Sequence, residues 1–203
     1  MKKIETIWRE ILFQTIEKKN LPAGKAGREF TQKELAKSLG VSTSTIFQAL
    51  KPTRAMGAAR VTGRNFTLED PEKLLYYWAS VRNLANDTIF EGRVDLPLLE
   101  IEGMMPALSI FAGYSTARFI LKEAPADYDK VFVYAKSKED LASRFDFVEG
   151  KPNLYILKSD PFISSYGGKT TLAQTFVDIW NLNDWYAKEF TQALKDRIDD
   201  LLH

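Results

Sequence analysis

The sequence contains no cysteine and only one histidine, His203, which is its last residue. Without cysteine the chain forms no disulfide, no thiol nucleophile and no thiolate metal site. With histidine confined to the last position, a Ser-His-Asp triad, a histidine-ligated zinc ion and a histidine general base are all disfavoured. These two shortages remove many familiar classes of enzyme, and we expect neither catalysis nor a cofactor.

Long apolar runs are also missing. No stretch approaches the ~20 apolar residues that a membrane-spanning helix needs. Met1, Lys2 and Lys3 could open a signal peptide, but Glu5 and Glu10 interrupt the apolar region that should follow. We therefore expect a cytoplasmic protein, and its 203 residues are enough for one large domain or two small ones.

Acidic residues are scarce in the first third of the chain, although the whole chain has a net charge of only +1. Residues 1–68 carry 13 Lys and Arg against 5 acidic residues, whereas residues 69–203 carry 15 against 22. A polyanion is attracted to a basic surface such as that of residues 1–68 and repelled by an acidic one such as that of residues 69–203. The imbalance predicts a basic, nucleic-acid-binding head joined to an acidic body.

Residues 30–50, FTQKELAKSLGVSTSTIFQAL, have the spacing of a helix-turn-helix. A capping box formed by Thr31 and Glu34 should start the first helix. Gly40 should end it, because only glycine enters the left-handed region at low cost, and Ser42 is a natural N-cap for the second helix. The residues expected to be buried recur at helical spacing: Leu35, Ala36, Leu39, Ile46, Ala49 and Leu50. Helix pairs of this kind also occur in folds that never meet DNA.

Residues 58–68, AARVTGRNFTL, have two β-prone runs around Gly63 and Arg64 and therefore predict a hairpin, the wing of a winged helix. Pro52 disfavours helix at the residue before it, so the second helix should stop there. Short polar groups, an amide, an aromatic ring and cations remain outside and suit base edges and phosphates. The predicted DNA-binding residues are Thr31, Ser42, Thr43, Ser44, Phe47, Gln48, Lys51, Arg54, Arg60 and Arg64.

The remaining patterns complete an α+β protein. Residues 4–19 form an amphipathic helix, residues 21–28 a surface loop, and Asp70 with Pro71 starts a helix running to about Leu84. Beyond these, we predict strands at 108–112, 131–134 and 154–157 and helices at 114–121, 137–145, 170–180 and 184–202. The expected domains are a winged-helix domain with a linker helix at 1–86 and a small α/β domain with a mixed sheet at 87–203.

Two segments of the body could carry phosphate chemistry. The run from Gly167 to Thr171, GGKTT, opens a helix, but Ile163 stands where a P-loop needs its first glycine. Asp127 and Asp129 alternate before a strand and could hold a divalent cation together with Asp160 after the next strand. With the Gly-Tyr-Ser run at 113–115, they are a degenerate form of the nucleotidyltransferase pattern, but Tyr114 breaks the glycine-serine pair, and we favour a solvated acidic turn that leads into the strand.

The order of segments resembles a known family. A winged helix is followed by LEDPEKLLYYWASVRNL, FAGYSTARFIL, DYDKVFVYAK, NLYILKSD and TTLAQTFVDIWNL. This order is similar to the AbiEi-type antitoxin and transcriptional-regulator family of type IV toxin–antitoxin systems. The packing residues that carry the likeness include Gly113, Ala117, Gln174, Asp178 and Trp180.

The resemblance implies an autorepressing regulator that binds double-stranded DNA and has a non-catalytic, degenerate nucleotidyltransferase-like body. It also implies a nucleotidyltransferase-like toxin as a cognate partner. The alternative is an active nucleotidyltransferase-like enzyme with an attached nucleic-acid-binding head. Asp127, Asp129 and Asp160 separate the two hypotheses, because only the enzyme needs them on a metal ion.

Overall fold

The computed structural model describes residues 1–18, 29–107 and 109–203, and the protein has a mixed α+β fold. Contacts between residues divide the chain into two compact units. The N-terminal unit comprises residues 2–81 and 198–203, and the C-terminal unit comprises Met1 and residues 82–197. No helix among the described residues is both long and apolar enough to cross a membrane. The expected domains, 1–86 and 87–203, stay predictions, and the expected loop at 21–28 lies outside the described residues.

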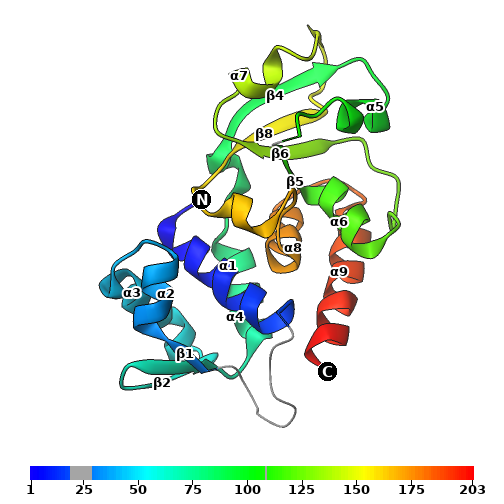
Figure 1. Cartoon of the computed structure of the whole chain (residues 1–203). Helices are drawn as coiled ribbons and strands as arrows, with labels where there is room; N and C mark the ends of the chain where they lie inside the picture. Colours follow the sequence, from blue (N-terminus) through cyan, green and yellow to red (C-terminus); the bar gives the residue numbers. More distant parts are fainter. Residues whose placement is uncertain (19–28, 108) are drawn as a thin grey trace. The chain divides into compact units, whose positions relative to one another are not determined.

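The N-terminal unit combines helices with a three-stranded antiparallel sheet of order β1-β3-β2 (Figure 1). Its elements are α1 (Lys3–Ile16), β1 (Glu29–Thr31), α2 (Gln32–Ser38), α3 (Thr43–Ala55), β2 (Ala59–Thr62), β3 (Asn65–Leu68) and α4 (Pro71–Val81). The expected helix start at Asp70 is confirmed, since its Oδ1 accepts the Lys73 N–H at 3.0 Å. The helix ends at Val81, a few residues before the predicted end.

The expected stop at Pro52 is wrong, because α3 runs through this proline to Ala55. Proline removes one N–H from the helical ladder, which normally disfavours the helix interior. Here the following residue, Thr53, is fully buried, and its hydroxyl donates to the Leu50 carbonyl at 2.8 Å. Burial of Thr53 and its bond to the Leu50 carbonyl therefore outweigh the lost hydrogen bond.

The C-terminal unit is built on a five-stranded mixed sheet of order β5-β6-β8-β4-β7 (Figure 1). The strands β6 and β8 are parallel, and the other neighbours are antiparallel. The strands are β4 (Thr88–Val94), β5 (Ile110–Ala112), β6 (Val131–Ala135), β7 (Phe147–Val148) and β8 (Leu154–Lys158). The helices are η1 (Leu84–Asp87), α5 (Leu98–Gly103), α6 (Gly113–Leu121), α7 (Glu139–Ala142), η2 (Ile163–Tyr166), α8 (Leu172–Trp180) and α9 (Ala187–Leu202), whose last turns belong to the N-terminal unit.

Most of the predicted elements of this unit are confirmed, but several bounds differ. The helix expected at 137–145 spans only Glu139–Ala142, and the helix expected at 170–180 begins at Leu172, with Thr171 as its N-cap. The strand β4 and the helix α5 were not expected. In β4, Gly92 and charged residues interrupt the apolar alternation that marks a strand.

Successive side chains of the parallel strands point to opposite faces of the sheet, and both faces are buried there. Val131 and Val133 of β6 pack in one cluster with Ile101 of α5 and Leu141 of α7. On the opposite face, Phe132 lies 6.1 Å, between ring centroids, from Tyr114 of α6. Because both faces are covered, the parallel strands read as continuous apolar runs, which is why the sequence revealed them.

A buried ionic network closes the second face of the sheet. The Arg82 Nε donates to Asp178 Oδ1 at 3.0 Å, its Nη1 to Asp87 Oδ2 at 2.5 Å and its Nη2 to the Tyr134 hydroxyl at 3.1 Å. The Tyr134 hydroxyl donates to Asp178 Oδ2 at 2.9 Å. Burial opposes the charge of Arg82, but Asp178 and Asp87 raise the pKa of the guanidinium. Burial and Asp178 raise the pKa of Tyr134 as well, so the phenol stays a donor.

Replacement of Arg82 by methionine should destabilise the C-terminal unit by about 3–5 kcal/mol, because Asp178 would remain as an uncompensated buried charge. Native-state hydrogen exchange of the β6 and β8 amides measures this loss. The matched control is Arg144→Met, since Arg144 is exposed, and its effect should stay within about 0.5 kcal/mol. Equal protection in both variants would contradict the assigned role of the network.

Candidate nucleic-acid interface

The turn into α3 has the local geometry that its sequence predicts. Gly40 has a φ of +55°, in the left-handed region, so it ends α2 without the steric cost of a side chain. The Ser42 Oγ accepts the Thr45 N–H at 3.1 Å and caps α3. The inner face of α3 is then completely buried through Ile46, Ala49, Leu50 and Thr53.

The outer face of α3 is exposed along its whole length. Its residues fall within an arc of roughly 140° at 100° per residue, opposite the buried face. All are solvent-accessible: Thr43, Ser44, Phe47, Gln48, Lys51 and Arg54. Phe47 is 44% exposed, and Lys51 Nζ lies 5.7 Å from the centroid of its ring. A phenylalanine that is 44% exposed among polar groups lies outside the core, and its exposed apolar surface favours a contact outside the chain.

Two tryptophans connect the helices that support α3. The buried Trp8 of α1 donates its Nε1–H to the Ala49 carbonyl at 2.9 Å. Its ring meets Tyr77 of α4 edge-on at 5.3 Å between centroids, and Trp78 Nε1 donates to Glu5 Oε2 at 3.3 Å. The sequence identified these residues only as apolar stripes. The polar N–H was the missed signal, because a buried indole normally requires an acceptor.

The expected hairpin is confirmed and is fastened to α2. Its strands pair from Ala59↔Leu68 to Thr62↔Asn65, and Gly63 turns the chain with a φ of +61°. The Gln32 N–H donates to the Arg64 carbonyl at 3.1 Å, so the start of α2 holds the tip of the hairpin. The rings of Phe30 and Phe66 stack at 5.0 Å between centroids, joining β1 to the same sheet.

Two of the predicted DNA-binding residues, Ser42 and Arg60, have side-chain partners within the protein, and a third, Thr31, lacks the cap bond expected of it. The expected capping box at Thr31 is wrong, since its side chain makes no cap bond and the Arg64 carbonyl holds the first turn of α2 instead. The Ser42 hydroxyl serves as the cap of α3. Arg60 Nε lies 3.1 Å from Glu69 Oε1 in a largely exposed ion pair, which contributes little because water screens it.

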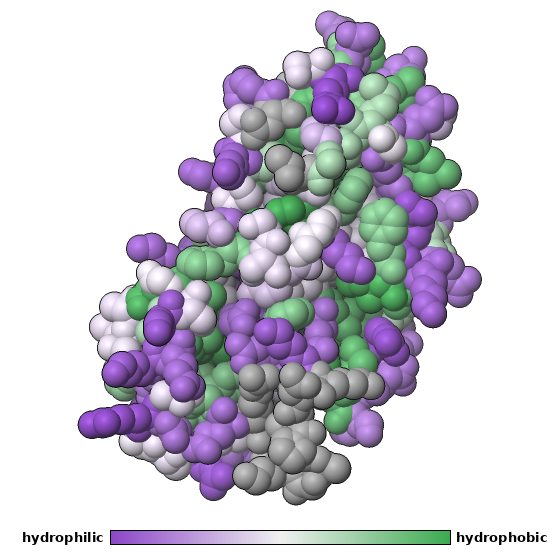
Figure 2. Space-filling view, viewed as in Figure 1, coloured by the Kyte–Doolittle hydropathy of each residue, from purple (hydrophilic) through white to green (hydrophobic). Residues whose placement is uncertain are grey.

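Cations and hydroxyls cover this part of the N-terminal unit. Lys51, Arg54 and Arg64 are exposed, as are Lys33 and Lys37 on α2. Figure 2 shows strongly hydrophilic side chains at the lower left of the view, over the region of β2. A positive surface with an exposed helix face and a hairpin can bind a polyanion through phosphates and a groove through side chains.

The three aspartates of the alternative hypothesis are not brought together. Asp127 and Asp129 precede the start of β6, whereas Asp160 follows the end of β8. Because β6 and β8 are parallel, the start of β6 and the end of β8 lie at opposite edges of the sheet. They are separated by the length of the strand, roughly 16 Å for five residues. Among the described residues no group of three His, Asp or Glu side chains could hold a metal ion.

Asp129 instead accepts a hydrogen bond from the Tyr186 hydroxyl at 2.5 Å. Burial and this bond raise the pKa of Tyr186. Lys130, the residue after Asp129, forms an ion pair with Asp184. The Asp184 Oδ2 also accepts a hydrogen bond from the Tyr114 hydroxyl at 2.9 Å. The acidic turn therefore fastens the start of β6 to the segment before α9.

The chain matches no family model, no curated protein and no solved structure. The likeness to the AbiEi-type family therefore stays an expectation from the sequence patterns.

Replacement of Gly63 by alanine should destabilise the hairpin by about 1 kcal/mol, because a side chain at a positive φ is strained even in open space. Gly63→Asn is the matched control and should cost less, since asparagine tolerates this region. Hydrogen exchange of the β2 and β3 amides measures both. Loss of the same size in both variants would show that the backbone conformation at Gly63 is not the cause.

Proposed function

We propose that the N-terminal unit is a winged-helix domain that binds double-stranded DNA sequence-specifically. In this proposal α3 enters the major groove and the β2–β3 hairpin is the wing. The observation that carries the proposal is the division of α3 into a fully buried face and an exposed face of polar and cationic residues. The order helix, strand, helix, helix and hairpin supports it, because winged-helix domains have this order.

The exposed residues divide by the part of DNA that suits them. Lys51, Arg54 and Arg64 suit phosphates, which position the protein and give affinity. Gln48 and Ser44 carry hydrogen-bonding groups for base edges, and glutamine pairs well with adenine. The fixed turn before α3 and the Trp8 bond behind it would hold these groups rigidly, which lowers the entropy cost of binding.

The C-terminal unit is proposed to be the non-catalytic body of an AbiEi-like antitoxin that represses its own operon from the cytoplasm. A nucleotidyltransferase-like toxin would be its partner. The separation of Asp127 and Asp129 from Asp160 supports this reading over an active transferase, because a metal clamp needs its carboxylates within a few ångströms of one another.

The test of DNA binding is a salt-dependent gel-shift assay on sequences selected by the full chain from a random duplex library. Arg64→Ala should weaken binding to all sequences and reduce the slope of log K against log salt by about 0.9, the value for one phosphate. Gln48→Ala should instead lose about 1–3 kcal/mol of discrimination at one base pair.

The control is Arg144→Ala, an exposed arginine of the C-terminal unit that should change neither the slope nor the preference. The proposal fails if no sequence is enriched by the selection. It also fails if a variant lacking both Gln48 and Arg64 binds the selected site as tightly as the unmodified chain.

Phe47 is predicted to contact a thymine methyl group, because an exposed apolar ring on a recognition helix has few other partners in a major groove. Replacing the contacted thymine by uracil removes one methyl group. The loss should weaken binding about fourfold, because burying one methyl-sized apolar group contributes ~0.8 kcal/mol. Phe47→Ala should bind both duplexes equally. Uracil placed outside the bound site is the control, and an equal loss in both proteins would disprove the contact.

A further inference from the structure

The C-terminal unit has a hollow of about 850 Å³ at the carboxyl ends of its two parallel strands. The register pairs Ala135 with Lys158, so β6 and β8 end side by side. The Ser159 N–H donates to the Ala135 carbonyl at 2.9 Å, so the segments that follow β6 and β8 leave the sheet side by side. Open α/β sheets bind small molecules beyond the carboxyl ends of parallel strands, and the hollow lies at that place.

The walls of the hollow are mostly apolar. Ile110 of β5, Leu141 of α7 and Ile163 of η2 line it from three different elements. Tyr134 also lines it, and its hydroxyl is bonded to Arg82 and Asp178, which fixes the ring in place. The hollow is therefore rigid on the side of the sheet. An apolar group of the size of a phenyl ring or an isobutyl group fits such walls.

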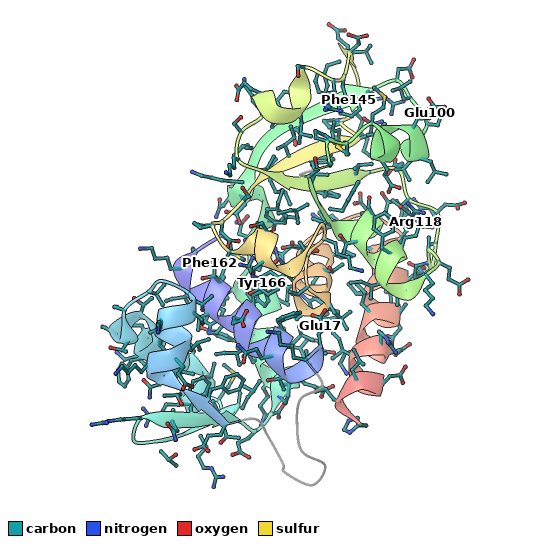
Figure 3. The ribbon with its side chains drawn as sticks, in the orientation of Figure 1. Glu17, Glu100, Arg118, Phe145, Phe162 and Tyr166 are labelled. Carbon is teal, nitrogen blue, oxygen red and sulfur yellow. The ribbon has the colours of Figure 1, made fainter. Side chains whose placement is uncertain are left out.

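Charged groups of opposite sign also line the hollow. Lys136 follows the end of β6, and Asp160 follows the end of β8. The Asp160 Oδ1 accepts the Phe162 N–H at 3.0 Å, and this bond orients the carboxylate. A carboxylate accepts about four hydrogen bonds, so it can hold several donors at one time. Figure 3 labels Phe162, which precedes η2, and Tyr166, which is the last residue of η2.

We propose that this hollow binds a zwitterionic α-amino acid with an apolar side chain. The ligand carboxylate pairs with Lys136, its ammonium group pairs with Asp160, and its side chain occupies the apolar part. A ligand with a carboxylate alone meets the negative charge of Asp160, and one with an amine alone meets the positive charge of Lys136. Only a molecule with both groups matches the two charges. The site does not depend on DNA binding by the N-terminal unit.

The test is calorimetric titration of the full chain with L-phenylalanine, 3-phenylpropanoate and 2-phenylethylamine. These probes share the phenyl group and differ only in the charged groups. L-phenylalanine should bind, and each analogue should bind at least about tenfold more weakly. L-leucine and L-tryptophan are added as second and third amino acids, so that a mismatch of side-chain shape does not decide the result.

Asp160→Asn keeps the acceptor for the Phe162 N–H but removes the charge, and it should weaken L-phenylalanine binding about fivefold. Lys136→Met should have an effect of similar size. The matched control is Lys158→Met, because Lys158 is exposed at the end of β8 but does not line the hollow, and its affinity should be unchanged. Ser164→Trp, at an exposed lining position, should abolish binding by filling the hollow.

Circular dichroism of each variant establishes that it is folded. The proposal is overturned if none of the three amino acids binds the unmodified chain. It is equally overturned if an analogue with one charge binds as tightly as L-phenylalanine, or if folded Ser164→Trp and Asp160→Asn both retain the full affinity.

Discussion

The parallel pairing of β6 with β8 is the constraint on which the C-terminal unit depends. It places Phe132 and Tyr155 in a stack at 4.7 Å between ring centroids and directs Tyr134 to the buried pair of Arg82 and Asp178. It also sets the chemistry at the two ends of the sheet. Asp129 is left at the starting edge, whereas Asp160 is brought beside the end of β6. The same pairing therefore keeps Asp129 and Asp160 too far apart to share a metal ion. It also places Asp160 and Lys136, which carry opposite charges, in the lining of one hollow.

In the N-terminal unit the corresponding constraint is complete burial of one face of α3. Ile46 and Ala49 have no exposed surface, so the helix cannot rotate about its axis without exposing its apolar side. Rotation is further limited by the Trp8 bond to the Ala49 carbonyl. The outer face is then fixed by default, because the residues that do not pack must face water. Fixed orientation is what a base-reading surface requires.

The sequence predicted turns and helix caps correctly, because interactions between near neighbours in the chain decide them. Gly40, Ser42, Gly63 and Asp70 act within a few residues of themselves through backbone conformation and capping, and the structure agrees with the expectation at each. The errors lie where distant contacts prevail. Burial of Thr53 carried α3 through Pro52, and the bond from Gln32 to the Arg64 carbonyl took the place of the capping box at Thr31.

The sequence by itself determined the excess of basic residues at 1–68 and the polar outer face of α3, because charge composition and helical spacing are properties of the chain. It also determined the apolar runs of β6 and β8, since strands buried on both faces need them. Only the tertiary structure decided that these two strands run parallel. Apolar runs are the same in either direction, and the direction alone places Asp160 far from Asp129 and near Lys136. Strand direction depends on how the connecting segments pack, which no local pattern records.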